Sequence, residues 1–375
     1  MKKKKVEWNK SLITCILLFM IISITTIYSA QTYLSNQLGN LALKQLIFYI
    51  IGFFIILIIK KIKIEKIFKY TWIYYFLGCF LLLLLLFIGT PINNSKCWFT
   101  IPGIGSFQPS EFMKIFLILA TSKLVSDSIH TNKKMNLKDE FFLIIKVFLL
   151  FLLPAVLTFL EPDTGVVIIY FIICLSILFV SGIRKSWFLI GLFLLSILLG
   201  IFFYLYFFQQ ELFVDLLGTN LFYRIDRILD WKNGTGLQLE NSLTSIGSSG
   251  FFGHGYNKTP LYFPESGTDF IFAVFASNFG LIGSILLIGL IVYFDYTLIK
   301  IAKNTKKSMY QYTIIGMSCM LIFQQFQNIA MTLGLVPIMG ITLPFISYGG
   351  SSLLSYFFII GIISSINDEK KRIIY

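Results

Sequence analysis

Residues 141–160 read FFLIIKVFLLFLLPAVLTFL, an apolar run in which only Lys146 carries a charge. A helix of about 20 such residues crosses the roughly 30 Å hydrocarbon core of a bilayer. Similar runs occupy residues 11–30, 41–59 and 72–88. The chain has 57% hydrophobic and 13% charged residues, whereas about a quarter of the residues in soluble domains are charged. The sequence therefore predicts a polytopic membrane protein.

We predict an all-α fold in which residues 1–375 form a single transmembrane domain. The expected spans lie near residues 11–30, 43–59, 70–89, 109–126, 140–160, 164–181, 187–208, 269–296, 312–335 and 348–366. The lysine-rich start of the chain leads into a full-length span with no small-residue cleavage site at its end, so we expect this first of ten helices to be retained.

Most of the 31 Lys and Arg residues lie on one side of the predicted spans, in residues 1–10, 60–69, 123–138, 184–185, 300–307 and 370–372. Loops rich in Lys and Arg stay in the cytoplasm. An even number of spans places both termini on that side. The net charge of +13 is thus interpreted as a topology signal and not as a nucleic-acid-binding surface.

Three segments on the opposite side concentrate the Pro, Gly, Asn and Ser residues that the spans lack: residues 90–110, 209–268 and 336–352. The middle one joins the seventh and eighth spans and is far longer than an ordinary loop. Loops of that length are uncommon unless they are functional. The functional surface is therefore expected to face the outside of the cell.

Glu111 and Lys114 open the fourth predicted span three residues apart, so they share one face of a helix. Ionisable residues inside a membrane are costly and usually face a polar interior. Two readings stay open for this pair: an ion pair that locks helix packing, or direct contact with a substrate.

Further acidic residues lie at the outer ends of spans. In Glu161-Pro162-Asp163, the proline interrupts the helix and Asp163 can cap the next one. Glu265 and Asp269 flank the start of the eighth span, where Thr268 as N-cap would make Asp269 a first-turn acid that complements the helix dipole. The amides Gln324, Gln325, Gln327 and Asn328 cluster in the ninth span, where bridging between helices is the expected role.

The sequence contains no pattern typical of a protein metal cage. Its five cysteines form no CxxC pair, and His130 and His254 lie in loops on opposite predicted sides.

Several motifs occur in order along the chain: CWF (97–99), IPGIGSFQPSEFMK (101–114), EPDTG (161–165), SIGSSGFFGHG (245–255), PESGTDFIFAV (264–274), NIAM (328–331), GLVP (334–337) and LPFISYGGSS (343–352). With these motifs the sequence resembles the SEDS family (shape, elongation, division and sporulation), the bacterial glycosyltransferases typified by RodA, FtsW and SpoVE. EPDTG corresponds to the family signature QPDxGT. Two departures stand out: Ser277-Asn278 replaces a common Glu-Glu pair, and Asn94-Ser-Lys-Cys-Trp98 replaces Gly-Ala-X-Arg-Trp.

The resemblance implies ten transmembrane helices with a lateral groove open to lipid, in the bacterial cytoplasmic membrane, and an enzyme that polymerises lipid II into glycan strands. It implies that Asp269 is catalytic. It further implies a substrate cavity formed by Trp98, Glu111, Lys114, Asp163, Glu265, Lys96, Ser347 and Tyr348.

The implied chemistry suits these residue types. A carboxylate at the outer mouth can take the proton of the acceptor hydroxyl as it attacks the anomeric carbon. The departing undecaprenyl pyrophosphate gains negative charge, which can be balanced by Lys114, Lys96, Arg224 or Arg227, or by a divalent cation (Mg²⁺ or Mn²⁺) held between phosphate and carboxylates.

The family also implies partners: a class B penicillin-binding protein that cross-links the new strand, and other proteins of the elongation or division complex. Elongation, division and sporulation all stay open as roles, with the short termini and the Trp98-Phe99 motif favouring a RodA-like role. Two other functions remain as alternatives: a flippase or transporter of the lipid-linked precursor, and an inactive scaffold.

Overall fold

The computed structural model describes residues 9–32, 40–92, 95–101, 105–131, 135–219, 222 and 236–374. Its elements are α1 (Lys10–Gln31), α2 (Leu41–Lys61), α3 (Ile64–Lys69), α4 (Thr71–Ile88), β1 (Thr90–Ile92), β2 (Ser95–Ile101), β3 (Gly105–Phe107), α5 (Pro109–Thr131), α6 (Leu137–Leu160), α7 (Thr164–Val180), α8 (Lys185–Phe208), α9 (Gln210–Leu217), α11 (Leu237–Gly247), α12 (Ile271–Lys303), α13 (Ser308–Thr332) and α14 (Gly350–Ile374).

Each of the ten predicted spans coincides with a long helix. Among the described residues, eight helices are long and apolar enough to cross a membrane: α1, α2, α4, α6, α8, α12, α13 and α14. The other two are α7, which is apolar but has only 17 residues, and α5, which carries Glu111 and Lys114. The multi-pass membrane fold is confirmed, while the count of ten crossings stays a prediction.

The segment between α4 and α5 adds a small sheet to a fold that is otherwise helical, as predicted. β1, β2 and β3 form a small antiparallel sheet, with Thr90 opposite Trp98 and Phe99 opposite Phe107. The Pro, Gly and Asn residues there had indicated only turns. The sheet rests against α4, α5 and α14, so it covers the outer end of the bundle.

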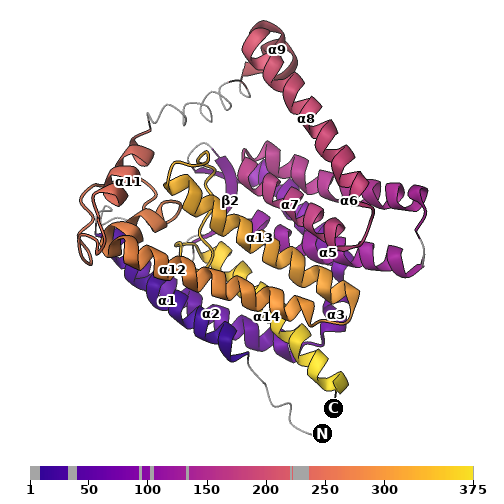
Figure 1. Cartoon of the computed structure of the whole chain (residues 1–375), viewed down its shortest axis with the longest axis horizontal. Helices are drawn as coiled ribbons and strands as arrows, with labels where there is room; N and C mark the ends of the chain where they lie inside the picture. The colour runs from indigo at the N-terminus through magenta and orange to yellow at the C-terminus, as the bar shows by residue number, and fades with distance from the viewer. Residues whose placement is uncertain are drawn as a thin grey trace.

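The helices form one bundle around a continuous apolar core. α13 packs against α12, α7 and α5, while α14 packs against α2 and α5 (Figure 1). α8 differs from all of these. None of its most apolar stretch is buried, and the helix projects away from the bundle (Figure 1). A helix that is apolar all round is stable in this position only in a lipid environment.

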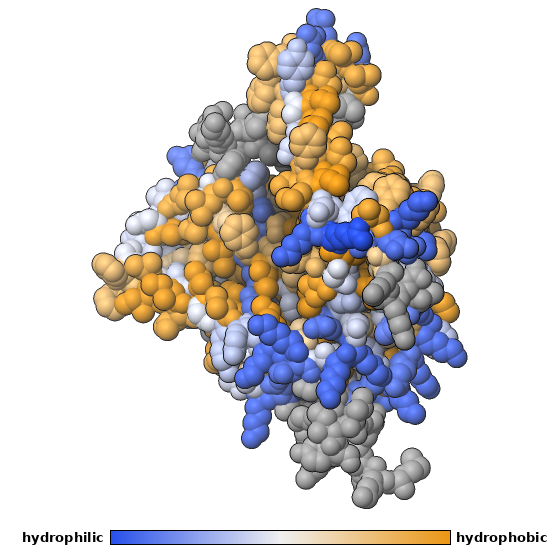
Figure 2. All heavy atoms as spheres, turned by 45° about the vertical axis from the view of Figure 1, so that its right-hand side comes forward, coloured by the Kyte–Doolittle hydropathy of each residue, from blue (hydrophilic) through white to orange (hydrophobic). Residues whose placement is uncertain are grey.

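Lysines mark one end of the bundle. Figure 2 shows hydrophilic residues gathered at the lower end of the molecule below a hydrophobic middle. The end of α2 and the start of α13 both meet α14 there, through the ion pairs Lys60–Asp368 (3.1 Å) and Lys307–Glu369 (2.6 Å). The positive-inside rule predicts that this is the cytoplasmic end, here called the inner end, and the orientation stays a prediction. The sheet and α11 lie at the opposite, outer end.

α12 is interrupted at Gly280, where φ is 65° and ψ is −162°. Such backbone is open only to glycine. The loop at residues 250–255 bonds to the backbone groups around the interruption, for example Leu281 N to Gly250 O at 3.0 Å and His254 N to Ser277 O at 2.9 Å. A Cβ at Gly253 would lie 2.3 Å from the Asn278 carbonyl oxygen. The close approach explains the glycines at 253 and 280.

Candidate functional site

Three segments from the outer loops meet at the outer end of the bundle: the turn at residues 265–270, the extended segment at 337–349, and the corner at 161–163 between α6 and α7. Tyr348 N donates to Gly267 O at 2.9 Å, which joins the first two. A Cβ on Gly165 would lie 2.8 Å from the Met339 carbonyl oxygen, so the start of α7 touches the second segment. Together they bring Asp163 and Asp269 to one site.

Asp269 lies before α12 and not in its first turn. The N-cap of α12 is Phe270, which corrects the expectation that Thr268 caps this helix. The reason is that both polar groups of Thr268 are engaged elsewhere. Its hydroxyl donates to Glu265 Oε2 at 2.6 Å, and its carbonyl accepts from Ser347 Oγ at 2.6 Å.

The backbone of Asp269 is held by α13. Asn328 Nδ2 donates to the carbonyls of Asp269 and Ile341, both at 2.8 Å. The amide thereby ties the turn to the extended segment through the backbone of Asp269. Gly340 lies beside that carboxylate: a Cβ there would be 3.6 Å from Oδ2, and its φ of +64° favours glycine.

The environment of Asp269 favours the protonated form. Burial raises the pKa of its carboxyl to about 7, with further contributions from the negative charges of Glu265 and Asp163. Desolvation and neighbouring like charges both disfavour a carboxylate. A base with a pKa near neutrality is well suited to accept a proton at physiological pH.

Asp163 caps α7, as the sequence predicted. Its Oδ1 accepts from Val166 N at 3.2 Å, and its Oδ2 accepts from Gln108 Nε2 at 3.1 Å. Burial raises the pKa of Asp163 to about 6, against the opposing effect of the Val166 hydrogen bond. The charges of Glu111 and Lys114 also act on this carboxyl, in opposite directions, which connects it to the pair in α5.

Glu111 and Lys114 form the ion pair that their spacing predicts. Lys114 Nζ lies 2.8 Å from Glu111 Oε1, and the two side chains are 0% and 7% exposed. Ser355 of α14 donates to Glu111 Oε2 at 3.3 Å, and the ring of Tyr356 lies 5.9 Å from the ammonium. The pair thus links α5 to α14, which supports the packing interpretation without testing a contact with substrate.

Glu161 is the least satisfied of the acidic residues at this site. Its side chain is fully buried, and neither carboxylate oxygen has a hydrogen-bond partner among the described residues. Burial, followed by the charge of Asp163, raises the pKa of Glu161 to about 8. The Cys97 thiol of β2 donates to its backbone carbonyl at 3.0 Å and fixes the sheet over this corner.

The remaining predicted site residues differ in how they are placed. Ser347 is buried, and its hydroxyl bridges Leu343 N and Thr268 O, so it supports the turn. Trp98 and Tyr348 are half-buried, whereas Glu265 and Lys96 are exposed. Lys96 makes no ion pair with Asp269 or Asp163 in the described structure. Arg224 and Arg227 lie outside the described residues.

The residues of this site do not by themselves make a metal cage. In the described ranges, no three His, Cys, Asp or Glu side chains are grouped so that they could hold an ion. The expectation of a divalent cation between phosphate and carboxylates stays a prediction, and we derive no step through it.

Comparison with known proteins agrees with the fold and the motifs. The family model described as cell cycle protein, covering FtsW, RodA and SpoVE, matches residues 9–372. The chain belongs to this family. It is 32% identical to a probable peptidoglycan glycosyltransferase FtsW of Wigglesworthia glossinidia brevipalpis, over 96% of this chain and 94% of the relative. It is 30% identical to stage V sporulation protein E of Bacillus subtilis, over 98% and 99%.

Solved structures of the family share the whole fold. The rod shape determining protein RodA of Thermus thermophilus superposes with a TM-score of 0.71 at 23% identity, covering 99% of both chains. A chain from a peptidoglycan synthase complex, described as coordinating polymerization and crosslinking, gives a TM-score of 0.80 at 23% identity over 97% and 99%. Because these relatives carry FtsW, SpoVE and RodA names alike, the RodA-like role stays a prediction.

The departure from the family at Ser277-Asn278 has a structural use. Both residues are buried in α12. Ser277 Oγ lies 3.2 Å from His254 Nδ1, and Asn278 bonds to Thr259 and to Ser29 of α1. They fasten the loop at 250–259 to α12, roughly two helical turns from the start of that helix.

Sequence reasoning undervalued two amides at the site. The sequence predicts only that Asn328 bridges helices, and it assigns Gln108 no role of its own. The structure shows that each bonds directly to one of the two aspartates. Both lie inside family motifs, NIAM and SFQPS, so the motifs themselves were the available signal.

Proposed function

We propose that this protein is a peptidoglycan glycosyltransferase that polymerises lipid II at the outer face of the bacterial cytoplasmic membrane, with Asp269 as the general base. The observation that carries the proposal is the placement of the Asp269 carboxylate. It lies at the outer end of a membrane bundle, anchored through its backbone, with its pKa raised to about 7. The names of the FtsW and SpoVE relatives support the same activity.

In this proposal Asp269 accepts the proton of the acceptor sugar hydroxyl. The hydroxyl oxygen then attacks the anomeric carbon of the donor, and the bond from that carbon to the lipid pyrophosphate breaks. A single displacement inverts the configuration and yields a β-1,4 glycan. The lipid stays in the bilayer while the sugars react in water, which suits a site at the end of membrane helices.

The supporting residues have different roles. Asp163 lies close enough to raise the pKa of Asp269, so its charge helps to set the strength of the base. The charge of Lys114 is already balanced by Glu111 in a fully buried pair. The exposed Lys96 on β2 is therefore the described cation best suited to meet the departing pyrophosphate.

The site also implies a protein partner. A glycan polymerase leaves strands that must be cross-linked, and a structural relative comes from a complex described as coordinating polymerization and crosslinking. We propose that a class B penicillin-binding protein pairs with this chain, within an elongation or division complex.

The test is glycan synthesis by the purified full chain from lipid II, resolved on a gel, with and without the candidate partner. Asp269→Asn and Asp269→Ala are compared with Glu240→Gln, a matched change at an exposed outer acid on α11. We expect polymer from the wild type and from Glu240→Gln, and a loss of at least about 100-fold without the Asp269 carboxylate. If Asp269→Ala formed polymer at the wild-type rate, Asp269 would not be the general base. Absence of polymer from every form, partner included, would favour transport or scaffolding.

The pH dependence provides a second test of the same residue. A base must be deprotonated to act, so the polymerisation rate should rise with pH and level off above the pKa of Asp269, which is about 7. Between pH 5 and 6 the expected rise is about tenfold per unit. A rate that is flat from pH 5 to 8 would contradict the assignment.

A further inference from the structure

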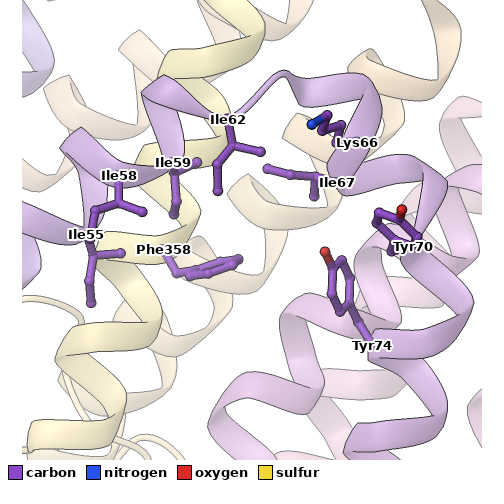
Figure 3. Close-up of a pocket in the computed structure, with 9 residues that line it drawn as sticks. All are labelled: Ile55, Ile58, Ile59, Ile62, Lys66, Ile67, Tyr70, Tyr74 and Phe358. Atoms are coloured by element: carbon purple, nitrogen blue, oxygen red, sulfur yellow. The ribbon is translucent and has the colours of Figure 1, made fainter.

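An apolar groove opens at the inner end of the bundle, far from the carboxylates. Its volume is about 410 Å³, and α2, α3, α4 and α14 contribute its walls. Figure 3 shows the isoleucines of α2 and Phe358 of α14 along one side, Tyr70 and Tyr74 along the other, and Lys66 of α3 at one end. The lining residues are Ile55, Ile58, Ile59, Ile62, Lys66, Ile67, Tyr70, Tyr74 and Phe358.

The groove is apolar along most of its length and polar at one end, which matches the acyl chain and head group of a lipid. Its α2 wall runs from Ile55 to Ile62, about 10 Å of helix, which is a large part of the roughly 15 Å depth of one leaflet. Ile58 is 58% exposed and Ile62 is 39% exposed. These side chains therefore face the hydrocarbon and can contact an acyl chain. The polar atoms, the Lys66 ammonium and the two tyrosine hydroxyls, lie on the side of α3.

α3 holds the polar end of the groove in a fixed position. Ile64, Ile67 and Phe68 are buried, while Lys66 on the other face is exposed. Lys123 of α5 donates to the Phe68 carbonyl at 3.0 Å and pins the helix to the bundle. The groove is thus formed by the fold itself and does not require a ligand to shape it.

Lys66 is the cation that faces the groove. Among the described residues its ammonium makes no hydrogen bond or ion pair, whereas Lys69 lies over the Tyr70 ring at 5.6 Å. Glu65 is the neighbouring acid on α3 and is not part of the lining. Basic pockets between membrane helices on the cytoplasmic side favour anionic head groups, and tyrosines favour this interface.

From this geometry we propose that the groove is a binding site for one anionic glycerophospholipid of the cytoplasmic leaflet. The phosphate lies at Lys66 and the hydroxyls of Tyr70 and Tyr74, and one acyl chain lies along Ile55, Ile58 and Phe358. The bound lipid stabilises the contact of α2 and α14 with α3. The site is independent of the proposed catalytic function.

Native mass spectrometry of the full chain, titrated with phosphatidylglycerol or phosphatidylcholine, tests this proposal. We expect one phosphatidylglycerol to remain bound at activation energies that remove phosphatidylcholine. Lys66→Gln should weaken this binding about fivefold. Lys63→Gln is the matched control, because Lys63 is an exposed neighbour in the same segment that does not line the groove. It should bind like the wild type.

A second variant probes the apolar wall. Ile58→Trp fills the groove while leaving Lys66 in place, and it should also release the lipid. Soluble glycerol phosphate should not compete, because it has no acyl chain. Equal losses for Lys66→Gln and Lys63→Gln would overturn the proposal in favour of a diffuse charge effect. The proposal would also be overturned if phosphatidylglycerol and phosphatidylcholine bound equally well, or if the lipid were lost when the chain formed a dimer.

Discussion

Two ion pairs, one at each end of the bundle, differ in how far they are withdrawn from water. At the outer end, Lys114 and Glu111 pair with 0% and 7% exposure, and Glu161 is fully buried with no hydrogen-bond partner for its carboxylate in the part of the chain that the structure describes. At the inner end, Lys307 and Glu369 pair at a similar distance, but the lysine side chain is 48% exposed. The Lys114–Glu111 pair is therefore desolvated, whereas the Lys307–Glu369 pair is partly solvated.

This difference separates two uses of charge in a membrane protein. Desolvating an ion costs several kcal/mol, so a fold retains buried charges only where other contacts offset that cost. The charges of Glu111 and Lys114 act on the pKa of Asp163, and the charge of Asp163 in turn acts on the pKa of Asp269. At the inner end Lys60 is buried against Asp368, but exposed lysines such as Lys66 and Lys307 remain in water, where they can orient the chain and attract anionic lipid at little cost.

Removing one member of the outer pair should have the largest effect. Lys114→Ala leaves the Glu111 carboxylate buried and uncompensated, and the expected loss is about 3–5 kcal/mol of stability. The measurement is unfolding of the purified protein by denaturant or heat. A double variant, Glu111→Gln with Lys114→Met, contains no unpaired charge and should recover most of the loss. A double variant as unstable as Lys114→Ala would show that the charge was not the cause.

Glu161→Gln should change how the stability of the folded chain depends on pH, because it removes the buried Glu161 carboxyl. The pKa of Glu161 is raised to about 8 from an ordinary value of 4.5. Between these values the folded chain holds a proton that the unfolded chain has lost, so stability falls as pH rises. Each unit of pKa shift corresponds to about 1.4 kcal/mol.

Glutamine has no such titration, so the advantage of Glu161→Gln in melting temperature should be absent near pH 4 and grow up to pH 8. Glu65→Gln, at an exposed acid of the inner end, is the control and should follow the wild type at every pH. A constant difference between Glu161→Gln and the wild type would contradict the buried titration.

Asn328→Ala should separate anchoring of Asp269 from general packing. Loss of the amide leaves the carbonyls of Asp269 and Ile341 without this donor, at a cost of about 1–3 kcal/mol. Gln327→Ala is the matched control. Gln327 is the residue next to Asn328 on α13, and its amide donates to the Pro337 carbonyl. Both variants should lose similar stability, but only Asn328→Ala should lower kcat at saturating lipid II. Equal activities would assign Asn328 to packing alone.

The sequence predicted the parts of this molecule that depend on local patterns. Apolar runs predicted the long helices, and the spacing of Glu111 and Lys114 predicted their ion pair. The position of Asp163 just before a helix predicted its role as the N-cap. In each case the interacting groups lie within a few residues of one another.

Contacts between distant segments left no comparable signal. Asn328 reaches Asp269 across 59 residues, and Ser347 reaches Thr268 across 79. That second contact is why Thr268 does not cap α12, although its local sequence suits a cap. The small sheet was missed because its pairing competes with turn-forming residues, and local propensity does not decide between them. The groove likewise needs Phe358 of α14, which is far in sequence from the consecutive helices α2, α3 and α4.

Lys307→Ala is expected to have the smallest effect and is the direct counterpart of Lys114→Ala. The pair with Glu369 is short, at 2.6 Å, yet the lysine is half-exposed, so water compensates both charges when the pair is broken. The expected loss is below about 1 kcal/mol in the same unfolding experiment, and it should shrink further in high salt. Because the bond lengths of the two pairs are similar, burial is the property that distinguishes them. A loss as large as that of Lys114→Ala would mean that charge is equally critical at both ends, and that desolvation is not what sets the outer site apart.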